Sequence, residues 1–456
     1  MRSPGRLRRR SSLLRAGSLA ASLLAFSLTG CSLVYRHSYL GPSFAIYSDR
    51  SPEFLSQVGK KVTRIYQGYE RLFGLSETRL GFSTIVLQGT DSTVLDYGYS
   101  PTLLGYYVPF FNYISVDTAS VSTQSEEMLD QVLLHEIAHH FIATEFPRAS
   151  QECWLNEGLA GGLEVTLFKE DHFEHPLFNP ILFQIAQRTA YSSPDSVSLK
   201  RLLDMSWSEF HRNEDKERNY ALAWSMVYFL LERSLPVGVP LGKRLEALYT
   251  MDRAQIPALQ SSWVSFLRGF DMAHHLLNFA RSDAPERCLT SLWATRQLGS
   301  LRSLDDLTVL EGLASLFDTP DLSKRALAFL SFVRVLERNP NSFFLSEKCV
   351  GDGLKRLDEA LESPLEPVPL RESLAIALGE SMKTRRHWLP RLISLLDREE
   401  GDVRAAAATS LSRMALKPTI ANPSFWRDAP SQARRQEVAE WRQWLEREEK
   451  VWAQVP

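Results

Sequence analysis

The chain has 456 residues, which is enough for two or three domains with hydrophobic cores of their own. Its composition is that of a globular protein, with 44% hydrophobic and 23% charged residues and no low-complexity tracts. The formal net charge is −2, and the basic residues form no stripe. Nucleic-acid binding is therefore not expected.

The first thirty residues predict a secretory signal. Arginines between Arg2 and Arg15 precede an apolar segment, Leu19 to Leu28, that is too short to span a bilayer as a helix. The segment ends in Leu28-Thr29-Gly30-Cys31, which resembles the lipobox of bacterial lipoproteins. The resemblance implies that Cys31 is lipidated and becomes the mature N-terminus. An ordinary cleaved signal is the alternative.

We therefore expect residues 1–30 to be removed, residues 31–41 to form a tether, and Cys31 to anchor the protein to a membrane, outside the cytoplasm. Ser32 follows Cys31, which by the same resemblance favours the periplasmic side of the outer membrane if the cell has two membranes. Three other cysteines remain, an odd number, so a disulfide framework is not expected. Cys153 is expected to be a buried structural residue.

Residues 42–284 predict a first domain that mixes strands and helices. A strand is expected at Phe44–Ser48, a helix from about Asp49 to Gly74, and a second strand at Phe82–Gln88. The aromatic-rich stretch Gly105–Val116 predicts a hairpin or an edge strand, with Pro109 at its turn or margin.

The segment Leu134-His135-Glu136-Ile137-Ala138-His139-His140-Phe141 carries the most informative spacing in the chain. Apolar residues recur around it at helical spacing, which predicts an amphipathic helix. Residues four apart share a helix face, so His135 and His139 can present two imidazoles to one metal ion, with Glu136 beside them. Two histidines with a glutamate after the first form the metallopeptidase signature. His140 lies off that face and is expected to pack or to support the ligands.

A second segment, Trp154-Leu155-Asn156-Glu157-Gly158, offers a third ligand. A catalytic zinc takes three protein ligands and keeps one position open for water, and a carboxylate is a suitable third ligand. Glu157 is the candidate, on a following helix that Gly158 allows to approach its neighbour closely. Gly161 and Gly162 are expected to interrupt that helix.

The two motifs together resemble the gluzincin clan of zinc metallopeptidases, especially the peptidase MA-like superfamily. The resemblance implies a zincin-like fold, zinc held by His135, His139 and Glu157, and Glu136 as the general base. It also implies that an edge strand at 112–116 lines the cleft and pairs with the substrate backbone. A plain core hairpin is the alternative for those residues.

Two further features bear on this resemblance. The Gly-x-Met-Glu-Asn strand of the gluzincin aminopeptidases does not occur here, which favours endopeptidase action. Tyr220 begins an apolar helix predicted at Tyr220–Glu232, in the region where this clan places an oxyanion-stabilising tyrosine. A tyrosine that only packs at a helix start is the alternative. Asp171–Pro180 is expected to be a loop with His172 and His175 exposed.

Residues 285–456 predict an all-α domain. Leu370–Leu378 and Val403–Leu411 resemble each other, and each follows a leucine-rich helix across a short turn. Helix pairs at this spacing resemble HEAT-type repeats, whose concave faces bind protein partners. A non-repeating helical bundle is the alternative.

The sequence therefore predicts an α+β chain, with a zincin-like peptidase domain followed by a HEAT-like helical domain. The expected function is that of a membrane-anchored, extracytoplasmic zinc metallopeptidase acting on a protein or peptide. The alternative is a catalytically silent lipoprotein scaffold that binds protein partners through its helical repeats. Hydrolysis of a non-peptide bond at the same metal site also remains open.

Overall fold

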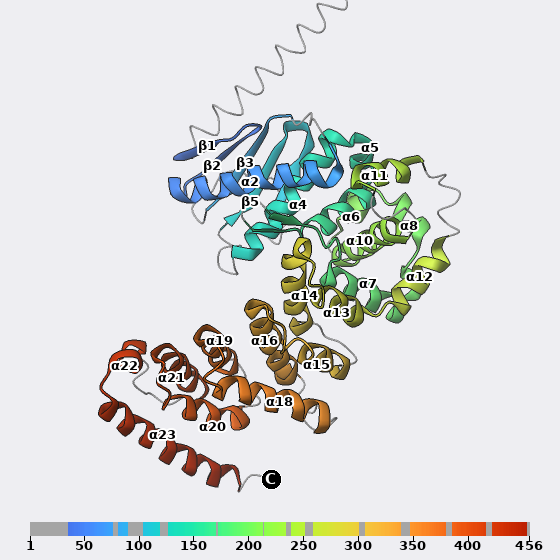
Figure 1. Cartoon of the computed structure of the whole chain (residues 1–456). Helices are drawn as coiled ribbons and strands as arrows, with labels where there is room; N and C mark the ends of the chain where they lie inside the picture. The colour runs from blue at the N-terminus through green and yellow to red at the C-terminus, as the bar shows by residue number, and fades with distance from the viewer. Residues whose placement is uncertain are drawn as a thin grey trace, which may run out of the picture. The chain divides into compact units, whose positions relative to one another are not determined.

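The computed structural model describes residues 35–75, 81–89, 104–118, 126–169, 172–212, 214–233, 239–250, 259–300, 306–338, 347–379, 385–415 and 422–453. The predicted signal and the predicted lipidation site Cys31 lie outside these residues. The chain forms two compact units, Met1–Phe270 and Asp271–Pro456, which are described separately below (Figure 1). None of the helices in the described ranges is long and apolar enough to cross a membrane.

The first unit contains a five-stranded mixed sheet with the strand order β1-β2-β3-β5-β4. Its strands are β1 (His37–Leu40), β2 (Phe44–Ser48), β3 (Ser83–Gln88), β4 (Gly105–Val108) and β5 (Tyr113–Asp117). The three central strands are parallel, and β1 and β4 pair with them antiparallel. The two predicted strands are confirmed, and Gly105–Val116 is a hairpin with a 3-10 turn at Pro109–Phe111.

Helix α2 (Pro52–Phe73) follows β2 and packs against both β1 and helix α4 (Glu126–Glu145). It begins where the Ser51 side chain accepts a hydrogen bond from the backbone N–H of Phe54, with a proline in the first turn. It ends at Gly74, which has a φ of 70°, a left-handed conformation that favours glycine. The predicted helix is therefore confirmed at both ends.

Helix α4 (Glu126–Glu145) carries His135, Glu136 and His139. The prediction that it is amphipathic is wrong, because every side chain from Leu133 to Ile142 is buried except His135, which is half-buried. The physical reason is that β4 and β5 pack against this helix together with helices α2, α5 (Pro147–Gln151) and α6 (Cys153–Leu163). Along that stretch the helix has no face left for solvent.

Helix α6 runs past both glycines that were expected to interrupt it. A Cβ atom at Gly161 would lie 2.9 Å from Cδ1 of Leu182 and 3.6 Å from Cβ of Trp224. Gly161 thus serves close packing, and the helix continues to Leu163, with all of its residues from Cys153 on buried. Gly158 has the predicted role, since a Cβ there would lie 2.7 Å from the backbone oxygen of Ala223 in helix α10 (Lys216–Arg233).

The first unit is completed by a two-stranded sheet and further helices. These are β6 (Leu167–Lys169), β7 (His172–Glu174), α7 (Pro180–Ser192), α8 (Leu199–Asp204), α9 (Trp207–Phe210), α11 (Leu241–Thr250) and α12 (Gln260–Gly269). Strand β7 replaces the start of the loop expected at 171–180. His172 is exposed as expected, whereas His175 is half-buried, because its ring packs against Tyr69 and Phe173.

The second unit is helical over its described residues, as predicted. Its α-helices are α13 (Met272–Ala280), α14 (Cys288–Ser300), α15 (Asp306–Ala314), α16 (Leu322–Arg338), α18 (Glu347–Glu362), α19 (Val368–Gly379), α20 (Arg385–Leu395), α21 (Gly401–Ala415), α22 (Pro423–Asp428) and α23 (Ser431–Trp452). Helices α14, α16, α19 and α21 follow one another in contact and form one layer.

Two neighbouring pairs in this layer meet through the same kind of contact. The hydroxyl of Ser331 in α16 donates to the backbone oxygen of Thr295 in α14 at 2.8 Å. The hydroxyl of Ser410 in α21 donates to the backbone oxygen of Ala375 in α19 at 2.9 Å. A glycine faces each of these serines, Gly299 and Gly379 respectively. The pairs α14–α16 and α19–α21 are thus built alike.

Candidate metal centre

Helices α4 and α6 bring the three predicted ligands together. Oε2 of Glu157 lies 3.5 Å from Nε2 of His135 and 3.3 Å from Nε2 of His139. The donor atoms of all three residues lie within 4.8 Å of one another. Two ligand atoms on a tetrahedral zinc ion, each bonded at about 2.1 Å, are about 3.4 Å apart. The spacing in this cluster therefore fits one such ion.

The side chain of Glu157 supports the same conclusion. Glu157 is 3% exposed, and its Oε2 atom has no hydrogen-bond partner within the described residues. A buried carboxylate oxygen without a partner is costly unless a cation or a donor satisfies it. Two imidazoles and one carboxylate are a donor set that suits zinc. The residues therefore fit the metal that the sequence predicts.

The charges in the cluster keep this carboxylate in the form that binds metal. Burial acts to raise the pKa of Glu157, but the charge of His139 and the close contacts with the surrounding imidazoles hold that pKa well below its usual range. Burial likewise acts to lower the pKa of His135, whereas its contact with Glu157 and its hydrogen bond to Glu164 raise that pKa well above its usual value. The ionised form of Glu157 therefore dominates near neutral pH.

Both histidines are oriented through their other ring nitrogen. Nδ1 of His135 lies 2.8 Å from Oε2 of Glu164, and Nδ1 of His139 lies 3.1 Å from Oδ1 of Asn156. Oε1 of Glu164 accepts a hydrogen bond from the Asn179 side chain at 2.7 Å. Such partners fix the tautomer and the ring orientation of metal-binding histidines. Sequence analysis did not assign these roles to Asn156 and Glu164, although both flank the Glu157 motif.

Glu136 lies beside the cluster and next to the sheet edge. It is 6% exposed, and burial raises its pKa, while the nearby charges of His135 and His139 act in the opposite direction. A Cβ atom at Gly105 of β4 would lie 3.0 Å from Cγ of Glu136. Strand β4 therefore passes beside this carboxylate.

The expectation that residues 112–116 form the edge strand along the cleft is wrong. Residues 113–116 lie in β5, which is paired on both sides, with β3 and with β4, and Asn112 ends the turn before it. Ile114, Ser115 and Val116 are buried. Among the described strands, β4 takes the position at the sheet edge, because the hairpin folds back over the outer side of β5.

Tyr220 lies near the cluster, as predicted, on helix α10. Its ring centroid is 6.2 Å from that of His135. Burial raises its pKa well above the usual value, and the charges of Glu157 and Glu136 add to that shift. The phenol therefore keeps its proton and can donate a hydrogen bond.

Sequence analysis missed His211, which follows helix α9. Its Nε2 atom lies 3.0 Å from Oε1 of Glu157, and its Nδ1 atom lies 2.8 Å from the backbone oxygen of Trp207. Burial acts to lower the pKa of His211, but the hydrogen bond to Glu157 and its charge raise it. The two side chains are 54 residues apart in the chain, and no spacing rule connects them.

Cys153 is buried, as predicted, and lies at the start of α6. Its thiol donates to the backbone oxygen of Met205 at 3.1 Å. Burial raises the pKa of this thiol to about 11. A protonated thiol engaged with a carbonyl is a poor metal ligand, so Cys153 stands apart from the cluster.

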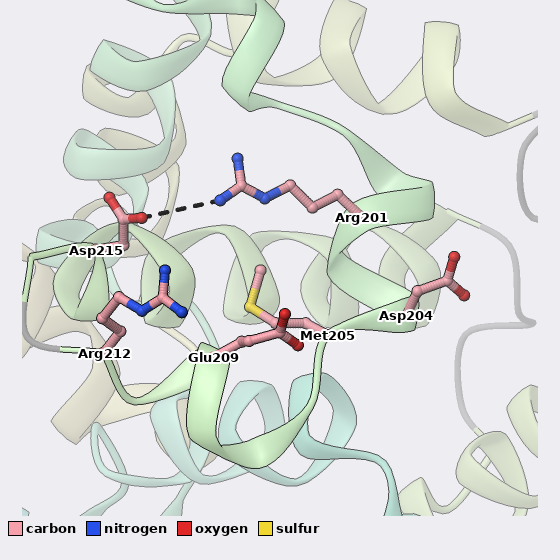
Figure 2. A pocket seen from close by; sticks show the side chains of 6 residues that line it. All are labelled: Arg201, Asp204, Met205, Glu209, Arg212 and Asp215. Atoms are coloured by element: carbon pink, nitrogen blue, oxygen red, sulfur yellow. Dashed lines mark ion pairs between the residues drawn. The ribbon is translucent and has the colours of Figure 1, made fainter.

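A separate pocket of about 210 Å³ opens beside helices α8 and α9 (Figure 2). Its lining consists of Arg201, Asp204, Met205, Glu209, Arg212 and Asp215. Arg201 points toward Asp215, at 3.8 Å, and the charged side chains are of both signs. None of the predicted site residues lines this pocket.

No protein-family model matches the chain, no curated protein matches it, and no solved structure matches it. The cluster is therefore interpreted from its own geometry and chemistry.

Proposed function

We propose that the first unit is a zinc-dependent peptidase of the gluzincin type that cleaves within a peptide chain. One observation carries this proposal. The buried Oε2 atom of Glu157, which lacks a hydrogen-bond partner in the described part of the chain, faces Nε2 of both His135 and His139. These three residues would hold the zinc ion.

Zinc would supply a Lewis acid that activates a water molecule and polarises the scissile carbonyl. Glu136, with a pKa raised by burial, would take a proton from the attacking water and deliver it to the departing amine. The protonated phenol of Tyr220 would donate a hydrogen bond to the developing oxyanion. The substrate would lie along β4, because Gly105 lets this strand pass close beside Glu136.

The proposal also covers the fold of each unit and the attachment of the chain to a membrane. The two metal-binding motifs support a zincin-like fold for the first unit. The similar contacts within the pairs α14–α16 and α19–α21 support HEAT-like repeats in the second unit. The signal-like N-terminal sequence supports the proposal that the protein is an extracytoplasmic lipoprotein anchored through Cys31. Protein or peptide substrates fit a peptidase joined to a helical unit of this kind.

A scaffold without catalysis is the second candidate. It is favoured by the second unit, whose stacked helix layer is typical of proteins that bind partners along an extended surface. A scaffold would keep its cellular role when Glu136 is replaced, whereas a peptidase would lose it.

The test measures metal content and peptide hydrolysis on the purified full chain. The wild-type protein should hold about one zinc per chain and should cleave members of a peptide library. Glu157→Gln should lose the metal, because the amide is a far weaker ligand than the carboxylate. Glu136→Gln should keep the metal and lose hydrolysis, because the base is gone.

Two outcomes would overturn the proposal. One is a folded wild-type chain that takes up no zinc when zinc is added. The other is zinc-dependent hydrolysis that Glu136→Gln leaves unchanged. Retained zinc without cleavage of any peptide would favour the scaffold.

A further inference from the structure

The carboxylate of Glu157 is divided between two environments. Its Oε2 atom faces the imidazole pair, at 3.3 and 3.5 Å. Its Oε1 atom faces Nε2 of His211, at 3.0 Å. His211 does not belong to the group of donor atoms that lie within 4.8 Å of one another. His211 thus contacts a ligand and stands outside the ligand set.

The ring of His211 is itself held firmly. Its Nδ1 atom faces the backbone oxygen of Trp207 at 2.8 Å, and its plane stacks on the Trp207 ring with an interplanar angle of 6°. The ring of Tyr220 meets it edge-on, with centroids 5.9 Å apart. The carbonyl oxygen of Trp207 and the carboxylate oxygen of Glu157 both only accept, so each ring nitrogen of His211 donates to its partner.

The short helix α9, which His211 follows directly, is fixed at both ends. Ser206 and Glu209 form a reciprocal cap at its start. At its end, the side chain of Asn219, which is 2% exposed, donates to the backbone oxygen of Phe210 at 2.9 Å. Phe210 is fully buried. The position of the imidazole therefore follows from backbone contacts as well as from its contact with Glu157.

We propose that His211 is a positioning residue that holds Oε1 of Glu157 by a hydrogen bond, so that Glu157 offers a divalent cation one oxygen, Oε2. This inference rests on the proposed metal site. A carboxylate that offers one oxygen occupies one position on the ion, which leaves a position for water. Without the donor from His211, Oε1 is no longer held away from the ion, and the carboxylate can offer both oxygens.

The experiment compares His211→Leu with His211→Gln in the full chain. Leucine removes the donor, whereas glutamine places an amide N–H near the position of Nε2. Zinc affinity is measured by competition with a chelator, and Co²⁺ is substituted to report ligand geometry through its visible absorption. His274→Gln, at an exposed histidine on helix α13, is the matched control.

His211→Leu should weaken zinc binding about 10–100-fold, the usual effect of removing a partner of a metal ligand. Its Co²⁺ spectrum should weaken toward that of a more highly coordinated ion. His211→Gln should restore most of the affinity and the wild-type spectrum. The control should bind like wild type.

Three results would overturn the inference. Wild-type affinity and an unchanged Co²⁺ spectrum in His211→Leu would show that the hydrogen bond does not position Glu157. Complete loss of metal in both folded variants would make His211 a ligand. Equal losses in both variants that track a loss of thermal stability would make its role purely structural. A wild-type chain that binds no zinc would instead refute the proposed function.

Discussion

Nδ1 of His135 lies 2.8 Å from Oε2 of Glu164, and Asn179 holds the other oxygen of that carboxylate. His139 has only the neutral amide oxygen of Asn156 in the corresponding position. The two histidine ligands are therefore supported unequally. A carboxylate partner raises the basicity of an imidazole more than an amide does, so His135 should be the stronger ligand.

Replacing Glu164 by glutamine tests this asymmetry. Glu164→Gln keeps the size of the side chain and removes its charge. We expect zinc affinity to fall about 10–100-fold, measured by competition with a chelator. Glu217→Gln, at an exposed position on helix α10, is the control. Equal zinc affinities in the two variants would show that Glu164 does not support His135 as a metal ligand.

Tyr220→Phe tests the proposed phenol donor. Loss of one aimed donor to a developing oxyanion lowers kcat by about 10²–10³-fold. Zinc content should not change, because the phenol is outside the ligand set. Steady-state kinetics on a cleavable peptide, with metal analysis alongside, measures both. A variant with wild-type kcat would leave Tyr220 with a packing role only.

Gly158→Ala tests the close approach of helices α6 and α10. The new Cβ atom would lie 2.6 Å from Cγ2 of Val227 and 2.7 Å from the backbone oxygen of Ala223. Because a backbone atom cannot move aside easily, we expect the free energy of unfolding to fall by about 1–3 kcal/mol in chemical denaturation. Gly269→Ala, which has open space around its Cβ position, should be neutral or slightly stabilising.

His175 should make the first unit sensitive to acid. Burial lowers its pKa in the folded chain to about 3, against about 6.5 when unfolded. Between these values the unfolded chain binds a proton that the folded chain excludes. The free energy of unfolding should therefore fall by about 1.4 kcal/mol per pH unit as pH drops below 6.5.

His175→Asn should flatten that dependence. The asparagine oxygen can still meet the Thr166 hydroxyl, which lies 2.7 Å from Nδ1 of the native ring. The free energy of unfolding of both proteins, measured by chemical denaturation between about pH 7 and about pH 5, tests this prediction. Parallel losses of stability would assign the acid sensitivity to other groups.

Arg404→Met tests the core of the second unit. Arg404 is 3% exposed, and its guanidinium donates to the backbone oxygens of Trp426 and Arg427 at 2.7 and 2.9 Å. Removing it leaves buried acceptors without a donor, which should cost about 2–5 kcal/mol in the stability of this unit. Zinc content should stay unchanged. Arg435→Met, at an exposed site on α23, should have little effect on either quantity.

Local rules predicted the elements of the fold well. Ser51, Pro52 and Gly74 mark the ends of α2 by capping and backbone chemistry alone. The spacing of His135 and His139 placed both on one helix face, and Glu157 was found because its motif follows closely. These signals lie within a few turns of each other in the chain.

The wrong predictions concern features that depend on tertiary packing. Gly161 and Gly162 were expected to interrupt the helix, but both are buried within it, and at Gly161 the close approach of Leu182 favours a small residue. Residues 112–116 looked like an edge strand, and only the hairpin partner β4 makes them internal. His211 contacts Glu157 from a distant segment of the chain, so no spacing of residues in the sequence predicts this contact. Sequence therefore indicated the ligands and missed most of what holds them.

The burial of helix α4 on every side has a consequence for mutational scans of this protein. Between Leu133 and Ile142, the helix that carries His135 and His139 is also part of the buried interior of the first unit. A substitution at Leu133 or Phe141 should impair function as severely as one at a ligand, although neither side chain is a predicted ligand. In a mutational scan, we expect almost every position from 133 to 142 to tolerate few substitutions. Separating damage to the fold from damage to the chemistry there requires a folding assay for each variant.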